Sequence, residues 1–178
     1  LHLIQLLATD LEQGRRVSIT VRDAVFDGRI ADCGSTWWLD AIFNGMIAGS
    51  GSTWSNAVAE VLAGGELIFE GGGVTGFDLS NVWTPLIWNR GGGLTLKDFE
   101  FFGNVLTGQP LVRADVGETN SYIDADEVVA TSNICREVFS VANLLPDSDG
   151  SAFGFGEGEF VFNRRADGGE APVANTDS

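Results

Sequence analysis

Four glutamates beside aromatic residues are the side chains of this sequence that come closest to a catalytic set. They lie in segments with strand-like alternation, at Glu70, Glu100, Glu157 and Glu159. Two carboxyl groups about 5 Å apart on facing strands would suit a retaining glycoside hydrolase. Sugar-binding clefts use several tyrosines, whereas this chain has only Tyr122. These glutamates are therefore better explained as residues on the solvent-exposed faces of strands. A small all-β glycoside hydrolase with paired glutamates is kept as an alternative function.

The other common catalytic patterns are missing or incomplete. His2 is the only histidine and no G-x-S-x-G motif occurs, which excludes histidine-dependent acyl transfer and a histidine-ligated zinc site. Residues 71–76 satisfy G-x-G-x-x-G, but Pro85 and the glycines at 91–93 prevent the helix on which a dinucleotide pyrophosphate would rest. We interpret residues 71–76 as a glycine turn and expect no cofactor.

Two acidic turns, at residues 124–127 and 147–150, are the only segments with a calcium-like appearance. The second begins like an EF-hand loop, but its glycine comes two positions early and the aspartate at the fifth ligand position is missing. Hydrogen bonding of aspartate side chains to their own turns explains both segments without a metal, so no metal ligands are assigned, and a loosely bound cation at either turn stays open. Cys33 and Cys135 belong to no C-x-x-C pair, and buried free thiols are favoured over a long-range disulfide.

The net charge of the chain indicates the kind of solvent to which the protein is adapted. The 178 residues include 25 acidic and 10 basic side chains, giving a net charge of −15, and the basic residues are nine arginines and Lys97. A polyanion would be repelled, which excludes nucleic-acid binding through a basic face. In molar salt the Debye length falls to about 3 Å and the self-repulsion is screened. Because the charges are spread along the chain, the composition indicates adaptation to strong brine.

Alternating apolar and polar residues predict a protein built mainly of short strands. The clearest strand is residues 17–22, and helices are expected at residues 3–12 and 55–65, with residues 133–145 ambiguous between helix and strand. Pro85 places the strand around it at a sheet edge. No repeat of fixed period is visible. Further strands are expected at residues 24–31, 36–43, 66–70, 74–79, 82–89, 94–102, 111–116, 121–130 and 151–163.

About ten strands separated by glycine-containing turns predict an all-β fold, namely an antiparallel jelly-roll or β-barrel type of sandwich with a short N-terminal helix and one or two short inserted helices. We expect one domain over residues 1–164 and a polar surface tail over residues 165–178. No apolar run approaches the 18 residues of a membrane-spanning helix. Since the sequence begins at Leu1 without a methionine, a leader upstream stays open.

One stretch resembles a known small barrel. Residues 3–79 are similar in order to the five-stranded Sm-like barrel: a helix, then Val17-x-Ile19-x-Val21-Arg22-Asp23, Asp27-Gly28-x-Ile30, Trp38-Leu39-Asp40-Ala41, a variable insert, and Leu67-Ile68-Phe69-Glu70-Gly71. The family's Arg-Gly pair is here Glu70-Gly71, and the loop at residues 32–35 lacks the family's asparagine. The resemblance therefore implies a barrel fold and a ring-forming habit, as a binding or scaffold protein, rather than RNA binding.

Surplus aromatic residues favour an assembly protein over an enzyme. Trp37 and Trp38 are adjacent, as are Phe101 and Phe102, so one ring of each pair must point away from the core of its strand. With apolar Leu3 and Leu7, these four are our candidate interface residues. In size, strand count and charge the chain resembles the single jelly-roll capsid proteins of viruses of halophilic archaea.

That resemblance implies a structural shell protein of an extreme halophile. It would be a homo-oligomer or part of a hetero-assembly with other shell proteins, without direct nucleic-acid contact. The expected location is the virion, and the alternative location is the cytoplasm of a halophilic archaeon.

Overall fold

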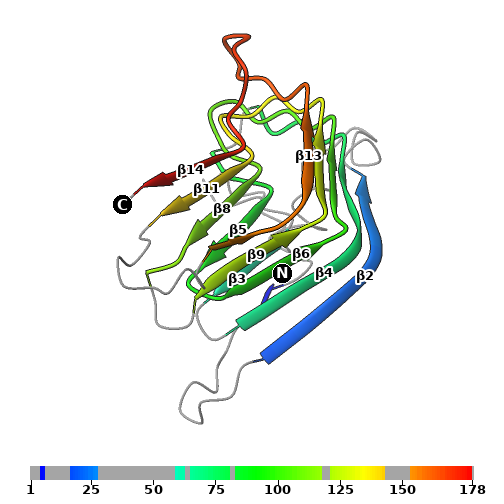
Figure 1. Cartoon of the computed structure of the whole chain (residues 1–178), viewed down its shortest axis with the longest axis vertical. Helices are drawn as coiled ribbons and strands as arrows, with labels where there is room; N and C mark the ends of the chain where they lie inside the picture. The colour runs from blue at the N-terminus through cyan, green and yellow to red at the C-terminus, as the bar shows by residue number, and fades with distance from the viewer. Residues whose placement is uncertain are drawn as a thin grey trace, which may run out of the picture.

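Every pairing between two strands in the described part of the chain is parallel. The computed structural model describes residues 5–6, 17–27, 59–62, 65–80, 83–117, 121–142 and 153–177. Successive turns of the chain lie on one another, so that the ribbon winds as a coil (Figure 1). This arrangement is a parallel β-solenoid, in which each coil contacts only its neighbours.

Two sheets form the walls of the solenoid. The first sheet contains, in spatial order, β1 (Gln5–Leu6), β3 (Ala59–Leu62), β5 (Ile87–Arg90), β8 (Val112–Asp115), β11 (Phe139–Ala142) and β14 (Ala174–Asp177). The second sheet bends around a corner, which the long strands β2 (Val17–Asp27) and β4 (Gly65–Thr75) cross without interruption. Later coils cross it as strand pairs: β6 (Gly93–Lys97) and β7 (Glu100–Phe102), β9 (Tyr122–Asp126) and β10 (Val128–Thr131), β12 (Phe153–Phe155) and β13 (Gly158–Val161).

From β3 onward one coil takes between 25 and 35 residues, whereas the register partners Val17 and Gly65 are 48 positions apart. Ile87 pairs with Val112, 25 positions later, whereas Phe139 pairs with Ala174, 35 positions later. The coils therefore repeat in space, although the sequence has no repeat of fixed period. The repeat escapes a search for a fixed period because insertions between the strands change the length of each coil.

Alternate residues of each strand point into the solenoid and stack on the same position one coil away. Leu67 and Phe69 of β4 are fully buried, and their partners on β6, Leu94 and Leu96, are fully buried as well. Each inward position thus continues as an apolar column along the axis. The hydrophobic effect from these columns stabilises the stack of coils.

The β-rich architecture is confirmed, but the antiparallel jelly roll is wrong because the strands pair in parallel. The helices expected at residues 3–12 and 55–65 are also wrong where the structure describes them, since β1 and β3 occupy parts of these segments. Residues 133–145, which were ambiguous between helix and strand, contain the strand β11. In β3, Ala59 and Val61 are buried at a spacing of two, and β-branched residues favour this extended form. The same apolar residues had suggested a helical face.

Two further segments differ from expectation. Pro85 precedes β5, which pairs with β3 on one side and β8 on the other and is therefore not an edge strand. Within the segment expected as a tail, β14 pairs with β11 and Ala171 is buried. Of the segments that suggested an Sm-like barrel, residues 17–23 and 67–71 lie in β2 and β4, which are parallel neighbours across ten paired positions, and residues 38–41 lie outside the described residues. In the described residues, no helix is long and apolar enough to cross a membrane.

Candidate functional site

A buried column of asparagines marks one corner of the coil. Asn104, Asn133 and Asn163 occupy equivalent positions on three successive coils and are almost fully buried. The Asn133 side chain donates to the Asn163 Oδ1 at 2.8 Å, and its own Oδ1 accepts from the Asn104 side chain at 2.9 Å. We call this column the amide corner.

The amide corner satisfies backbone groups that the bend in the chain would otherwise leave unpaired. The Asn104 Oδ1 accepts from the Phe77 backbone N–H at 3.1 Å, and the Asn133 Oδ1 accepts from the Asn104 backbone N–H at 3.0 Å. In the other direction, the Asn133 Nδ2 donates to the Phe101 carbonyl at 3.0 Å. Because unpaired buried amides are costly, these bonds give the column a structural role.

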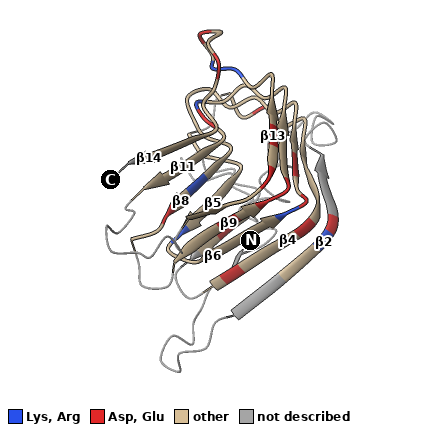
Figure 2. Ribbon diagram, viewed as in Figure 1, with Lys and Arg blue, Asp and Glu red and all other residues tan. Residues whose placement is uncertain are grey.

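Charged residues gather at a second corner, where the second sheet bends (Figure 2). One column there runs Arg22, Glu70, Lys97 and Asp126, each residue being the register partner of the next, and we call it the alternating column. The adjacent column, one residue further along each coil, places Asp23, Gly71, Asp98 and Glu127 at the bend itself. We call these two columns together the charged corner.

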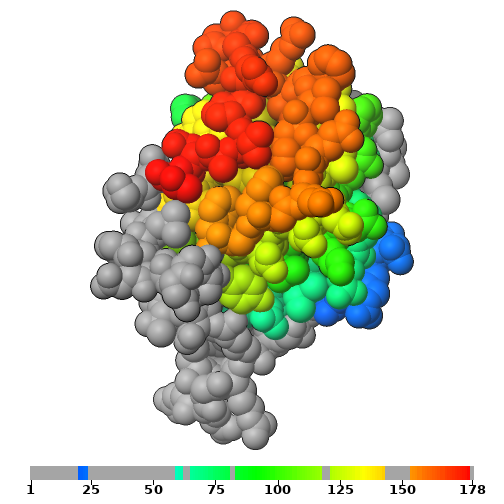
Figure 3. All heavy atoms as spheres, viewed as in Figure 1, coloured from blue at the N-terminus to red at the C-terminus, as the bar shows by residue number. Residues whose placement is uncertain are grey.

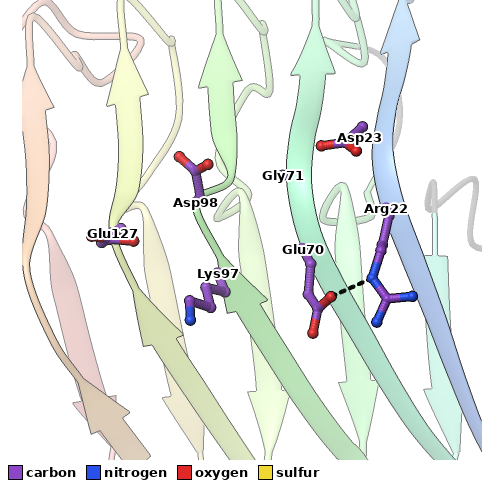
Figure 4. A pocket seen from close by; sticks show the side chains of 7 residues that line it. All are labelled: Arg22, Asp23, Glu70, Gly71, Lys97, Asp98 and Glu127. Atoms are coloured by element: carbon purple, nitrogen blue, oxygen red, sulfur yellow. Dashed lines mark hydrogen bonds and ion pairs between the residues drawn. The ribbon is translucent and has the colours of Figure 1, made fainter.

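An open groove of about 400 Å³ follows the charged corner (Figure 4). The Arg22 Nε lies 2.6 Å from a Glu70 carboxylate oxygen, and the two side chains point toward one another, whereas Lys97 points away from Glu70. Asp98 and Glu127 lie on adjacent coils, which are about 4.8 Å apart. Both are exposed to solvent. Within the described ranges, no group of three or more Asp, Glu, His or Cys side chains is arranged to hold a metal ion.

The glutamates singled out from the sequence do not form a facing pair. Glu70 has Arg22 and Lys97 as register partners. Glu100 and Glu159 share a column, but Val129 lies between them, so their backbones are about 9.6 Å apart. Glu157 follows β12 and extends the charged corner beyond Glu127. The 5 Å arrangement expected for a retaining glycosidase is thus not made by any two of these four residues.

A cation–π cluster on the outward side of the first sheet was not predicted. The Trp88 ring lies beneath two guanidinium groups, 4.8 Å from that of Arg90 and 5.5 Å from that of Arg113. The indole nitrogen of Trp88 also donates to Asp115 at 3.1 Å. Trp88 and Arg90 lie on β5, whereas Arg113 and Asp115 lie on β8, so the two pairs meet only through the coil register and form no local motif.

Four phenylalanine rings meet at the last coil that the structure describes, residues 153–177, which we call the terminal coil. The rings of Phe153, Phe155 and Phe160 lie between 5.7 and 6.5 Å from the buried ring of Phe139 on the coil before. Their register partners are inward-facing residues, yet Phe155 is 43% exposed. In the described residues no strand covers the outer side of β12, β13 or β14.

The structure describes two of our six candidate interface residues. Phe101 is fully buried and Phe102 is 46% exposed, as expected for neighbours on one strand. The other four, Trp37, Trp38, Leu3 and Leu7, lie outside the described residues, as do Cys33 and the turn at 147–150. Cys135 is a buried free thiol, as expected.

Fold and sites together place the chain in the class of parallel β-solenoids. Comparison with protein-family models, curated proteins and solved structures found no match.

Proposed function

We propose that this protein is a structural assembly protein, a β-solenoid that self-associates in brine through its terminal coil. The observation that carries this proposal is the exposure of Phe155, in an inward position, beside strand edges that no described strand covers. Phe155 is 43% exposed although its partner Ala125 on the coil before is buried. A ring in an inward position is exposed only when nothing lies on the next level of the stack.

Solenoids require polar caps at their ends, because an open coil presents both apolar side chains and unpaired backbone groups. The terminal coil has neither a polar inner face nor a covering strand in the described residues. Association that covers this end would bury the rings and pair the edges of three strands at once. This explains the surplus of aromatic residues without a catalytic function.

The net charge of −15 sets the conditions for such association. In dilute buffer two copies would repel one another, whereas in molar salt the repulsion is screened and apolar contacts become stronger. The proposed setting is accordingly a shell or surface layer of a halophile, for which a virion is one case. None of the four glutamates considered for glycoside hydrolysis is the register partner of another on an adjacent strand, which favours the structural role.

Light scattering coupled to size-exclusion chromatography, in molar and in dilute NaCl, tests the proposal. We expect oligomers in molar salt and Phe155→Gln to lower their apparent affinity at least tenfold. Trp83→Gln is the matched control, because Trp83 is 83% exposed but precedes β5 on an inner coil. Circular dichroism in the same buffers checks that both variants are folded. A wild-type chain that is monomeric at every salt concentration contradicts the proposal.

A further inference from the structure

We propose that the terminal coil is covered by the terminal coil of a second copy of this chain, which is related to the first by a two-fold axis perpendicular to the solenoid axis. This inference rests on the proposed function and specifies the symmetry and the register of its interface. The residues of the terminal coil, orange to red in Figure 3, form a continuous surface on the face turned toward the viewer. In the described residues no strand covers the outer edges of β12, β13 and β14.

The end of the stack is a ramp with a step, because each coil climbs one level per turn. The ramp begins at β12, continues through β13 and reaches β14, which lies on β11 and begins a level that the second sheet lacks in the described residues. A two-fold rotation exchanges the low and the high end of this ramp. The step of each copy therefore fits the step of the other, and the two ends can make contact around the whole coil.

A second copy placed by translation alone does not fit this end. Gln5 and Asn175 lie in the same register column of the first sheet. If β2 of the second copy paired with β12 and β13, its β1 would therefore coincide with β14 of the first copy. The two-fold arrangement avoids this overlap. It is isologous, so it closes at two copies.

A short turn between the two sheets fixes the register of the copies at the step. Residues 91–92 join β5 to β6, and Asn89 and Leu94 lie equally far from that turn. On the terminal coil these two columns end in Thr176 and Phe153. A two-fold axis through the turn therefore places Thr176 of one copy opposite Phe153 of the other, with β14 and β12 antiparallel.

In this register β14 covers the rings that the terminal coil leaves open. Two residues further from the turn, Ala174 of one copy lies opposite Phe155 of the other. Both are inward positions, because the partner of Ala174 is the buried Phe139 and that of Phe155 is the buried Ala125. The small side chains of β14 leave space for the large rings of β12. Phe155, which is 43% exposed in the single chain, thus becomes buried.

The same axis passes through the bend at the amide corner, on the far side of the coil. Ser132 lies midway in the sequence between Ala125 and Phe139, the partners of the pair just described. Its counterpart on the terminal coil is Phe162, whose ring is 71% exposed. The Phe162 rings of the two copies therefore meet on the axis. Within its own chain this ring buries little surface, so the second copy accounts for an aromatic side chain at an exposed bend.

Charges on the two copies are complementary beside the axis. Glu159 and Arg165 lie three residues before and three residues after Phe162, so the axis places Glu159 of one copy beside Arg165 of the other. Glu159 is exposed, and the half-exposed Arg165 has Asp167 as a partner at 3.8 Å. A guanidinium group has five N–H donors and can bind both carboxylates. The other acidic side chains of the two ends repel one another, so the dimer requires high salt.

Cysteine trapping on the axis tests the arrangement directly. In a Cys33→Ala, Cys135→Ala background, Phe162→Cys is expected to give a disulfide-linked dimer when oxidised with diamide in molar salt. A two-fold axis at this position brings the residue within bonding range of the same residue in the second copy. Ser132→Cys is the matched control, because Ser132 is exposed, has the same φ of 59° and lies one level deeper. Its two copies would be three levels, about 14 Å, apart, so we expect at least tenfold less dimer.

Charge reversal provides a second, independent measurement. Glu159→Arg is expected to raise the dissociation constant at least threefold at the lowest salt concentration at which the wild type dimerises, and Arg165→Glu in the same chain is expected to restore it. Glu100→Arg is the matched control, because Glu100 lies in the same column two levels away from the interface. If the wild type is oligomeric but Phe162→Cys gives no more dimer than Ser132→Cys, the two-fold arrangement is overturned and the proposed function stands. A wild type that is monomeric in molar salt overturns both.

Discussion

The two corners of each coil solve one backbone problem in opposite ways. Both contain residues with positive φ: Gly103, Ser132 and Phe162 precede the asparagines of the amide corner, while Asp23, Asp98 and Glu127 stand at the charged corner. At the amide corner the next side chain turns inward and pairs with buried backbone groups. At the charged corner, in the column at the bend itself, Asp98 and Glu127 face solvent and place one acid on another.

This difference shows where the fold is determined and where it is adapted to solvent. The amide corner contributes hydrogen bonds that hardly depend on salt, because its atoms are buried. The charged corner places like charges about 4.8 Å apart, an arrangement that salt must screen. The same solenoid therefore contains two kinds of column. The buried asparagines of the amide corner specify the bend, whereas the exposed acidic side chains of the charged corner are stable next to one another only in brine.

Asn133→Ala should have the largest effect. It removes the acceptor for the buried Asn104 N–H and the amide nitrogen that donates to the Phe101 carbonyl and to the Asn163 Oδ1. We expect the free energy of unfolding to fall by about 4 kcal/mol, measured by denaturant titration in molar salt. Asn175→Ala is the control, because Asn175 is exposed on β14. A loss below 1 kcal/mol for Asn133→Ala would show that water replaces the amide.

The Cys135 thiol reports how tightly the amide corner is closed, since it follows Asn133 by two residues. Burial, with a smaller effect of Glu137, raises its pKa from 9.0 to about 12. In a Cys33→Ala background, alkylation at pH 8 should be at least about 100-fold slower in the native chain than in denaturant. Equal rates would mean that this corner opens readily.

The raised pKa of Cys135 also makes the stability of the fold depend on pH, and the stability falls as the pH rises. Above pH 9 the unfolded thiol ionises while the folded thiol keeps its proton, so the folded chain binds more protons. The contribution of Cys135 to stability is therefore complete below pH 9 and is lost as the pH rises toward 12. Comparison of Cys135→Ala with its parent over this range isolates the effect.

Sequence patterns predicted the strands well and their partners poorly. A period of two marks β2, β4 and β9 as strands, but it is the same for parallel and antiparallel neighbours. The decisive signal was the recurrence of Asn104, Asn133 and Asn163 at intervals of 29 and 30 residues, each after a residue that bends the chain. Three polar residues in a β-rich sequence look like turn residues until their burial is known.

The candidate sites were harder to predict, because their residues come together only through the pairing register of strands on different coils. Arg22 and Glu70 are 48 residues apart, and Trp88 meets Arg113 across 25 positions. Neither of these separations in sequence corresponds to a known motif. The correct prediction for Phe101 and Phe102, one buried and one exposed, needed only the alternation within a single strand.

Glu127→Gly should sharpen the contrast between the corners. Glu127 has φ of 54° and lies beside Asp98, so the change relieves both an unfavourable backbone conformation and a like-charge contact. We expect stabilisation of about 1.5 kcal/mol in dilute salt and about 1 kcal/mol in molar salt, by denaturant titration. Glu127→Gln keeps the backbone cost and isolates the charge. A gain that does not shrink with salt would assign the whole effect to the backbone.

Phe162→Gly is expected to have the smallest effect and to test the amide corner from outside. Phe162 has φ of 59°, where Gly103 stands two coils earlier, and its ring is 71% exposed. Little burial is lost on replacement, while glycine adopts this conformation without steric cost, so the chain should gain about 0.5–1 kcal/mol. Ser132→Gly, one coil earlier, is the matched comparison and should gain a similar amount. If Phe162→Gly instead destabilises the chain only under conditions in which it is oligomeric, the exposed ring contributes to the interface, and the end of the amide corner belongs to the assembly surface.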